Sequence, residues 1–201
     1  MDNDLNGKKI AIVVENGFEQ VEMTGPREAL DEAGAETDLI SPADKKVKAW
    51  DLTRWGRSFK VDVPLAEARA EDYDALLLPG GVMNPDKLRV NQQALDFVKA
   101  FFDAGKPVAA ICHAPWTLID AGVVKGRRMT SYPSVKTDLK NAGAEWVDEE
   151  VVVDNGLVTS RQPSDIPAFN KKIIEEFGEG THKQDKPPQQ GEPAMAGHSV
   201  D

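Results

Sequence analysis

The sequence predicts an α/β fold: a single-domain, doubly wound, flavodoxin-like structure in which helices flank a mostly parallel sheet. Three short apolar runs carry this prediction, at 9–14 (KIAIVV), 75–78 (ALLL) and 108–111 (VAAI). Each run is short and lacks the alternation of a half-solvated strand, which is typical of a strand buried on both faces. Segments with helical spacing separate the runs, and strands that alternate with helices form parallel sheets.

The N-terminal part of the chain shows this pattern first, as a strand–helix–strand unit. After the strand at 9–14, apolar residues recur at roughly helical spacing over 19–33, and Gly34 closes the segment. Pro26 lies inside this span, and we expect the helix to begin at or near it, because proline disrupts a helix interior. A second strand is expected over 37–40.

The rest of the chain alternates between further strands and helices. Trp50 and Trp55 lie among charges in the segment 49–63, which is typical of a hairpin or an excursion from the sheet. Asn155-Gly156 is the strongest short hairpin signal in the chain. The other expected elements are helices at 92–104, 116–121, 135–142 and 166–177, and strands at 127–131, 151–154 and 157–160.

Composition limits the classes of function. The 201 residues suit one domain, expected over 1–178, and the Gly-, Pro- and Gln-rich segment 179–201 is expected to be a disordered tail. A net charge of −10 argues against non-specific nucleic-acid binding and against docking on anionic membranes. A single cysteine, no signal peptide and no apolar run long enough to span a bilayer lead us to expect a cytoplasmic protein.

The segment after the third apolar run contains the candidate catalytic residues. Cys112 and His113 come directly after the strand at 108–111, and Pro115 suits the first turn of a helix. A sharp strand-to-helix turn of this kind is a nucleophile elbow. The pKa of a thiol falls near the N-terminus of a helix, so Cys112 is a candidate nucleophile. The alternative is that Cys112 is a small buried hydrophobe.

The histidines exclude several kinds of site. Of His113, His182 and His198, the last two lie in the segment expected to be disordered, so a triad with an ordered late histidine is excluded. His113 is then the only candidate catalytic histidine, although neighbours on a sharp turn need not touch each other. One cysteine and one ordered histidine are too few for a structural zinc site, so no metal is expected. Residues 79–81 match no phosphate-binding fingerprint, so no cofactor is expected.

Taken together, these motifs resemble the PfpI family of intracellular cysteine hydrolases, within the glutamine-amidotransferase-like superfamily. The resemblance runs from about residue 8 to residue 177, and Ala114 departs from the glycine that many members have after the histidine. It rests on the segments 16–22 (NGFEQVE), 78–81 (LPGG), 84–86 (NPD), 105–113 (GKPVAAICH), 130–133 (TSYP), 141–143 (NAG), 146–148 (WVD) and 159–161 (TSR).

The resemblance implies roles for individual residues. Cys112 matches the nucleophile, and Glu22 matches an acidic residue that hydrogen-bonds the sulfur. Glu19 is the alternative for that role, although a solvated residue in the first turn of the helix is the simpler interpretation. Gly81, together with the turn after Cys112, would supply backbone N–H groups to an oxyanion hole.

Two further residues match the family at the edge of this site. Asp86 matches an acidic residue that orients His113 across a subunit interface, and an N-terminal helix residue is its alternative interpretation. Tyr132 matches a tyrosine near the pocket, and a half-buried structural tyrosine is its alternative. The resemblance also implies a homodimer or homohexamer.

The resemblance implies attack by Cys112 on a carbonyl, and the reaction then has two possible outcomes. One is glyoxalase III or deglycase activity, on small reactive aldehydes or on glycated protein. The other is an intracellular peptidase. The absence of an independent histidine leads us to favour aldehydes or their adducts over peptides. A redox-sensing or chaperone-like stress protein is the non-enzymatic alternative. Glutamine amidotransfer is excluded, because it requires the late histidine.

Overall fold

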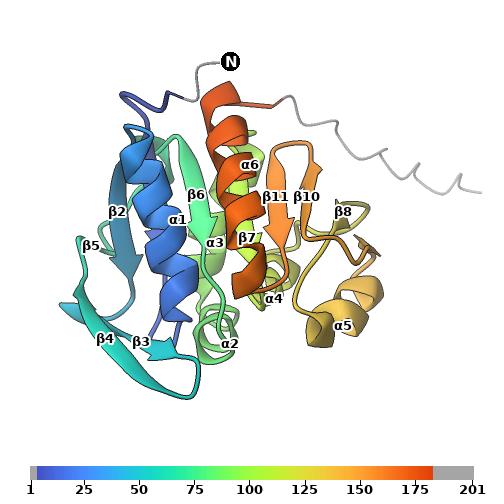
Figure 1. Cartoon of the computed structure of the whole chain (residues 1–201), viewed down its shortest axis with the longest axis horizontal. Coiled ribbons are helices and arrows are strands. Elements are labelled where there is room, and N and C mark those ends of the chain that lie inside the picture. The colour runs from blue at the N-terminus through green and yellow to red at the C-terminus, as the bar shows by residue number, and fades with distance from the viewer. Residues whose placement is uncertain (1–3, 183–201) are drawn as a thin grey trace, which may run out of the picture.

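A seven-stranded sheet forms the centre of the molecule, which a computed structural model describes over residues 4–182 (Figure 1). The strand order is β10-β11-β7-β6-β1-β2-β5, and every neighbouring pair is parallel except β10–β11. This is the flavodoxin-like α/β architecture that the apolar runs predict. The strands are β1 (Lys9–Val13), β2 (Glu36–Ser41), β5 (Val63–Pro64), β6 (Ala75–Leu78), β7 (Val108–Ile111), β10 (Val151–Asp154) and β11 (Leu157–Ser160).

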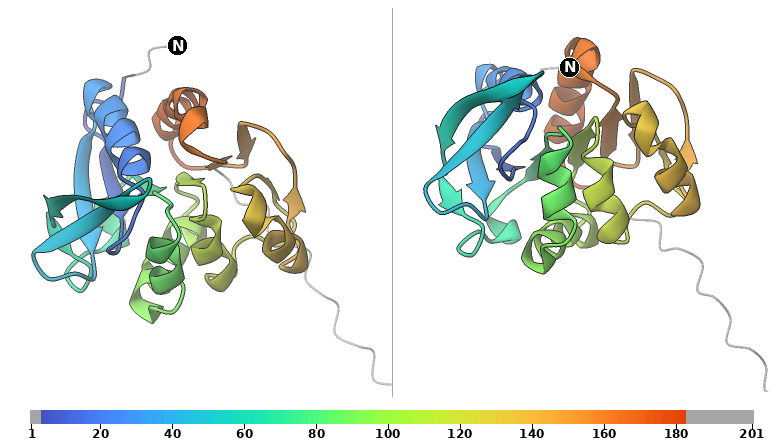
Figure 2. Two further views of the ribbon diagram at one scale, coloured as in Figure 1. Left: turned by 60° about the horizontal axis from the view of Figure 1, so that its bottom comes forward. Right: turned by 90° about the horizontal axis from the view of Figure 1, so that it is seen from below.

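Helices cover both faces of the sheet, as Figures 1 and 2 show. One face carries α1 (Gln20–Glu32) and α6 (Ile166–Glu179). The other carries α2 (Met83–Leu88), α3 (Gln92–Asp103), α4 (Pro115–Asp120) and α5 (Lys136–Asn141).

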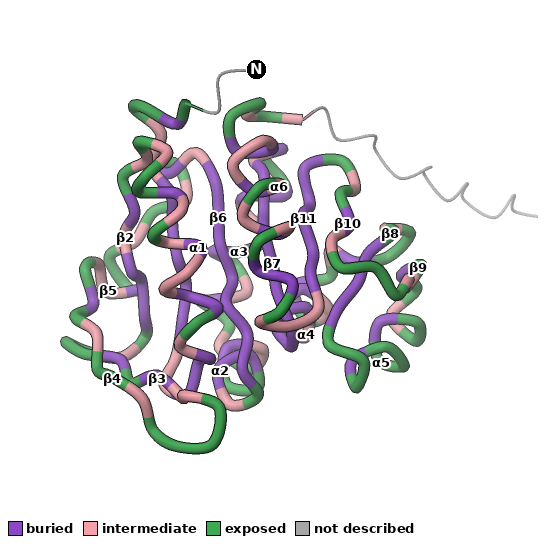
Figure 3. The backbone as a smooth tube through the Cα atoms, viewed as in Figure 1, coloured by how far each residue is buried: buried purple, intermediate pink, exposed green. Residues whose placement is uncertain are grey.

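The core therefore lies in two layers, one on each side of the sheet. Along β6, Leu77 belongs to the layer under α1 and α6, whereas Leu76 and Leu78 belong to the layer under α3. Successive strand residues point to opposite faces, so a strand between two helical layers must be apolar at every position. Figure 3 shows the central strands as buried along their length, which explains why the runs lack alternation.

Smaller elements extend from the sheet. The strands β3 (Lys46–Asp51) and β4 (Arg54–Lys60) form an antiparallel hairpin, as the aromatic and charged segment predicts. The short strands β8 (Arg128–Met129) and β9 (Glu145–Trp146) pair in parallel. Three 3₁₀ turns occupy Ala70–Asp72, Pro133–Val135 and Pro163–Asp165.

The prediction that α1 begins at or near Pro26 is wrong. The helix begins at Gln20, and Pro26 lies in its second turn, buried against the core. Proline removes only its own donation to the carbonyl of Glu22, four residues earlier. Burial of Met23 and Leu30 on the same face stabilises the helix on both sides of that missing bond.

The prediction of a disordered tail from residue 179 is wrong for its first residues. Helix α6 continues to Glu179, and the backbone N–H of His182 donates to the Gly105 carbonyl at 2.8 Å. Residues 183–201, with His198, lie outside the described part of the chain, so the prediction for them stays a prediction. No helix within residues 4–182 is long and apolar enough to cross a membrane.

Candidate active site

Three loops meet at the carboxyl end of the sheet and bring the predicted site residues together. The loops come after β1, β6 and β7, which are neighbours in the sheet. They lead to Glu22, Gly81 and Cys112 respectively. The right-hand view of Figure 2 looks at this end of the molecule. In open α/β sheets this edge is where ligands bind.

Cys112 occupies a strained turn between β7 and α4. Its φ is +65°, a left-handed conformation that costs a residue with a Cβ on the order of 1–2 kcal/mol. Backbone hydrogen bonds hold it there: its N–H donates to the Ser160 carbonyl at 3.0 Å, and its carbonyl accepts the N–H of Tyr132 at 2.9 Å. The predicted nucleophile elbow is therefore the observed conformation.

Backbone donors surround the sulfur. The N–H groups of Gly81 and His113 both hydrogen-bond Cys112 in a sense that favours the thiolate, lowering the pKa of its thiol. These are the groups expected to form an oxyanion hole. Burial is the larger effect, since the residue is only 7% exposed, and the pKa of the Cys112 thiol lies well above that of a free cysteine. The lowered pKa expected from the helix N-terminus is therefore wrong for the protein without substrate.

Glu22 is the acid beside the sulfur. The residue is fully buried in the first turn of α1, and burial raises the pKa of its carboxyl to about 8. Its Oε2 accepts the N–H of Gly80 at 3.0 Å. The neighbouring Cys112 side chain lowers the pKa of the carboxyl, but by less than burial raises it. Glu22 is therefore protonated at neutral pH.

The protonation of Glu22 decides its effect on the thiol. An ionised Glu22 would raise the pKa of Cys112 further by like-charge repulsion. Below pH 8 the carboxyl is protonated, and this repulsion is absent. A sulfur that loses its proton during a reaction would therefore face a neutral acid as well as the N–H groups of Gly81 and His113, and it could accept a hydrogen bond from each.

The Gly80-Gly81 turn fits between the acid and the nucleophile. A Cβ on Gly80 would lie 2.6 Å from Glu22 Oε2 and 2.7 Å from Cys112 Cβ, so only glycine fits. Gly81 has a φ of +78°, which also favours glycine. Buried Asn84 holds the turn, because its amide donates to the carbonyls of Pro79 at 2.8 Å and Gly80 at 3.0 Å.

His113 contacts the sulfur of its own neighbour. Its Nδ1 lies 3.1 Å from Cys112 Sγ, and its Nε2 lies 3.0 Å from Ser134 Oγ. The ring stacks on Tyr132 at 4.7 Å and meets the edge of Trp116 at 5.1 Å. Burial lowers the pKa of His113, so the imidazole is neutral at pH 7 and can take up a proton.

Ser134 is a site residue that the sequence analysis missed. It directly follows the segment 130–133 that carries the family resemblance, and its position there was the only available signal. Tyr132 lies beside His113, as the resemblance implies, and is 38% exposed.

Two predicted acids lie away from the sulfur. Glu19 is only 8% exposed, and its Oε1 accepts the N–H of Leu52 at 3.3 Å, so its interpretation as a solvated residue is wrong. Asp86 is exposed on α2, and the structure gives no contact between it and His113 within the described chain. Its role across a subunit interface stays a prediction.

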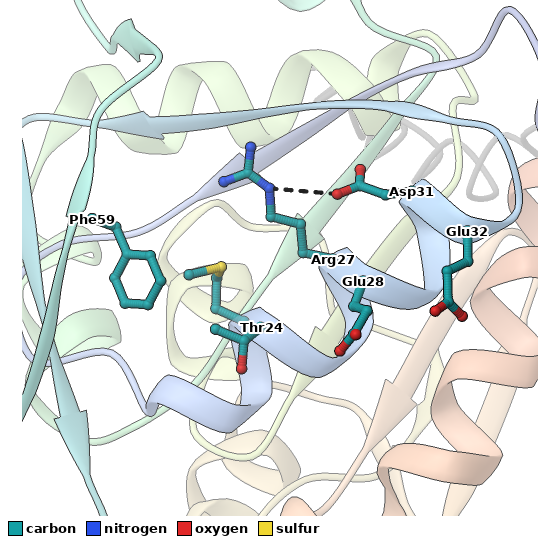
Figure 4. Close-up of a pocket in the computed structure, with 7 residues that line it drawn as sticks. Thr24, Arg27, Glu28, Asp31, Glu32 and Phe59 are labelled. Carbon is teal, nitrogen blue, oxygen red and sulfur yellow. Dashed lines mark ion pairs between the residues drawn. The ribbon is translucent and has the colours of Figure 1, made fainter.

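A separate cleft of about 480 Å³ lies on the outer face of α1, away from Cys112 (Figure 4). Arg27 is one of the residues that line this cleft, and its Nε lies 3.9 Å from Asp31 Oδ2. The cleft is lined by Met23, Thr24, Arg27, Glu28, Asp31, Glu32 and Phe59. It does not include the candidate nucleophile.

Comparison of the sequence with known proteins finds relatives that match most of the chain. An uncharacterized protein of Staphylococcus aureus is 46% identical over 173 residues, which cover 85% of this chain and 98% of that protein. An uncharacterized protein of Staphylococcus haemolyticus is 44% identical over 172 residues, with the same coverage.

Solved structures with a similar fold include two proteins of the same kind. Drosophila melanogaster DJ-1beta superposes with a TM-score of 0.76 at 30% identity, covering 86% of this chain and 94% of that chain. A two-domain Anabaena variabilis protein with DJ-1/ThiJ/PfpI-like and ferritin-like domains gives 0.80 at 37% identity, covering 85% and 48%. The family model "DJ-1/PfpI family" matches residues 8–176. The chain therefore belongs to the DJ-1/PfpI family.

Proposed function

We propose that the chain is a cysteine-dependent stress-protection enzyme that acts on small reactive aldehydes or their adducts on proteins. The observation that carries the proposal is the pairing of Cys112 with a buried, protonated Glu22. Burial raises the pKa of Glu22 to about 8, so this carboxyl can give and take a proton near neutral pH. A nucleophile with an acid of this kind beside it suits addition to a carbonyl.

For an α-oxoaldehyde such as methylglyoxal, the proposed reaction begins when the Cys112 thiol gives its proton to neutral His113, whose Nδ1 lies 3.1 Å from Sγ, and Sγ attacks the aldehyde carbon. A C–S bond forms, and the carbonyl oxygen takes the Glu22 proton to give a thiohemiacetal. The Gly81 and His113 N–H groups stabilise the developing oxyanion. This step uses only groups that already contact the sulfur.

The second half of the reaction moves a proton between two carbons. The Glu22 carboxylate removes the hydrogen of the attacked carbon as a proton, and protonated His113 gives its proton to the ketone oxygen, so an enediol forms. Glu22 then gives a proton to the neighbouring carbon and takes up the hydroxyl proton of the attacked carbon, which leaves a hydroxy thioester. Water then cleaves the C–S bond, releasing a hydroxy acid and restoring the thiol. The sum adds one water to the substrate and needs no external oxidant.

The depth of the site favours a small substrate. Cys112 and His113 are each 7% exposed, and the cleft of about 480 Å³ lies elsewhere on the molecule. A loop of a folded protein is much larger than an aldehyde of a few atoms and cannot reach such a sulfur without rearrangement of the site. Glycated side chains, which are long and flexible, are the largest substrates that suit this access.

One observation favours an intracellular cysteine peptidase as a second candidate. His113 Nδ1 lies 3.1 Å from Cys112 Sγ, which is the distance expected between a thiol and its general base. A neutral imidazole could take the thiol proton and return it to a leaving amine. The two candidates share the first addition and differ in which residue moves the proton afterwards.

We also propose that the protein is cytoplasmic and forms a homodimer or homohexamer. Leu52 and Trp55 on the β3–β4 hairpin are 70% and 48% exposed, and apolar side chains at such positions favour self-association. Light scattering of wild type and Leu52→Lys tests the oligomer. An unchanged mass in the variant excludes the hairpin from the interface.

The activity is tested by following methylglyoxal and its product by NMR with untagged protein. We expect lactate to form in proportion to methylglyoxal lost. Cys112→Ser should abolish it, and Glu22→Gln should lower the rate by about 10²–10⁴-fold, as expected for loss of a general acid or base. Glu28→Gln, on the exposed face of the same helix, is the matched control and should retain the wild-type rate.

A parallel assay separates the candidates. Peptide cleavage that disappears in Cys112→Ser and in His113→Ala, without lactate formation, would replace the aldehyde proposal with the peptidase. Loss of methylglyoxal at the same rate in wild type and Cys112→Ser would show simple reaction with lysine and arginine side chains. In that case the redox-sensing role would be the remaining explanation for Cys112.

A further inference from the structure

A cluster of potential metal ligands lies at the opposite end of the sheet from Cys112. Glu176 and Glu179 are on the last turns of α6, and His182 comes shortly after that helix. One ligand atom from each residue lies within 4.8 Å of the other two. We propose that Glu176, Glu179 and His182 form a binding site for a divalent transition-metal ion.

Two buried atoms in this cluster lack hydrogen-bond partners. Glu176 is 8% exposed, and neither its Oε2 nor His182 Nε2 has a hydrogen-bond donor or acceptor within the described chain. Buried polar atoms without partners are rare and need an explanation. The two atoms lie 3.4 Å apart, which is within ion-pair distance when His182 is protonated. Tetrahedral ligands about 2.0–2.1 Å from a zinc ion lie roughly 3.3–3.4 Å apart, so the spacing of these two atoms matches that of two ligands of one zinc ion.

Glu179 can bind the same ion as a third ligand. Glu179 lies three residues after Glu176 on α6, so the two side chains project from the same face of the helix. Glu179 is exposed and forms no ion pair among residues 4–182, so its side chain is free to rotate toward the ion. A water would complete the coordination. An imidazole with two carboxylates suits a transition ion such as Zn²⁺ better than Ca²⁺ or Mg²⁺.

The negative charge at the C-terminal end of α6 also favours binding of a cation. The last turn of α6 carries no basic residue, although the C-terminus of a helix favours positive charge. Glu176 and Glu179 bring two carboxylates together at this end of the helix, where like charges repel each other. Lys172 pairs with Glu175 at 2.7 Å and so is engaged elsewhere. A bound divalent ion would offset the repulsion.

The backbone places His182 at this site. Gly180 turns the chain with a φ of +83°, and the His182 N–H then donates to the Gly105 carbonyl. Gly156 makes room for the ring, because a Cβ there would lie 2.7 Å from His182 Cδ2. An ion would therefore fasten the end of α6 to the β10–β11 turn and to the loop before β7.

Titration of the full-length, untagged chain with Zn²⁺ by calorimetry tests the site. The background is Cys112→Ala, so that the thiol does not bind the probe. We expect one saturable site, and His182→Gln should weaken it by at least about 10-fold. Glu175→Gln, which removes a carboxylate from the same turn, is the matched control and should change the affinity little. His198→Gln controls for the other C-terminal histidine.

Two further measurements test metal binding without calorimetry. At about 100 times its dissociation constant, Zn²⁺ should raise Tm by about 5–10 °C, and this rise should be absent in His182→Gln. Bound Co²⁺ should give a visible spectrum that the same variant loses. The proposal fails if no site saturates below about 1 mM Zn²⁺, or if His198→Gln removes binding and His182→Gln does not. Either result leaves His182 and Glu176 as an ion pair.

Discussion

The buried carboxyl of Glu22 predicts a pH-dependent penalty on folding, which Glu22→Gln should remove. Burial raises the pKa of Glu22 from 4.5 to about 8. The unfolded chain therefore loses the proton first as pH rises, and ionisation favours unfolding between pH 4.5 and 8. The stability of the wild-type protein should fall through this window relative to that of a variant with a neutral side chain.

The size of the effect depends on the two pKa values. Each pH unit between them costs about 1.4 kcal/mol, so the penalty is about 3 kcal/mol at pH 7 and about 5 kcal/mol above pH 8. It is absent below about pH 4, where both states are protonated. Glutamine has nearly the same shape, and its carbonyl can still accept the Gly80 N–H. The comparison is made in a Cys112→Ser background, so that the thiol does not titrate.

Urea unfolding of the pair at half-unit steps from pH 4 to pH 9 measures the prediction. The difference in free energy of unfolding should grow in favour of Glu22→Gln as pH rises. Glu28→Gln, which removes a charge from the exposed face of α1, corrects for net charge. A difference that stays constant from pH 5 to pH 8 would mean that Glu22 ionises normally in the folded protein. The proton-transfer role proposed for it would then be refuted.

Three further predictions concern the same site. The pH dependence of iodoacetamide alkylation should give Cys112 a lower apparent pKa in Glu22→Gln than in wild type, because the charge of Glu22 and its hydrogen bond both raise the pKa of the thiol. Gly80→Ala should lower stability by about 1–3 kcal/mol in chemical denaturation, because its Cβ would lie 2.6 Å from a Glu22 oxygen. Ser134→Ala removes the partner of His113 Nε2, so the methylglyoxal assay should show a lower kcat in a protein whose circular dichroism is unchanged.

The parts of the fold that could be predicted are those in which local sequence and burial agree. Strands β6 and β7 have the predicted bounds, because a short, continuously apolar run suits a strand that is buried by helices on both faces. The Asn155-Gly156 hairpin is equally local: φ values of +46° and +78° are those that its turn requires. The elbow at Cys112 could be predicted from both, because a buried apolar run precedes it and a proline suited to a helix start follows it.

The predictions that failed depend on contacts distant in sequence. Pro26 locally favours a helix start, but packing of α1 on the sheet overrides it. His182 lies in a polar segment, yet Gly105 and Gly156 leave the space that seats it. Glu19 is buried because the β3–β4 hairpin, with Leu52, folds over the start of α1. Sequence spacing does not report such contacts.

The backbone around Cys112 fixes the position of the sulfur. A left-handed cysteine persists only where surrounding structure compensates, and here its N–H and carbonyl are both bonded to other strands or loops. Glycine would relieve the strain but would remove the sulfur. The same conformation turns Sγ toward Glu22 and toward the N–H groups of Gly81 and His113. The backbone cost is therefore offset by contacts that also define the chemistry, so the nucleophile and its donors are positioned before any substrate binds.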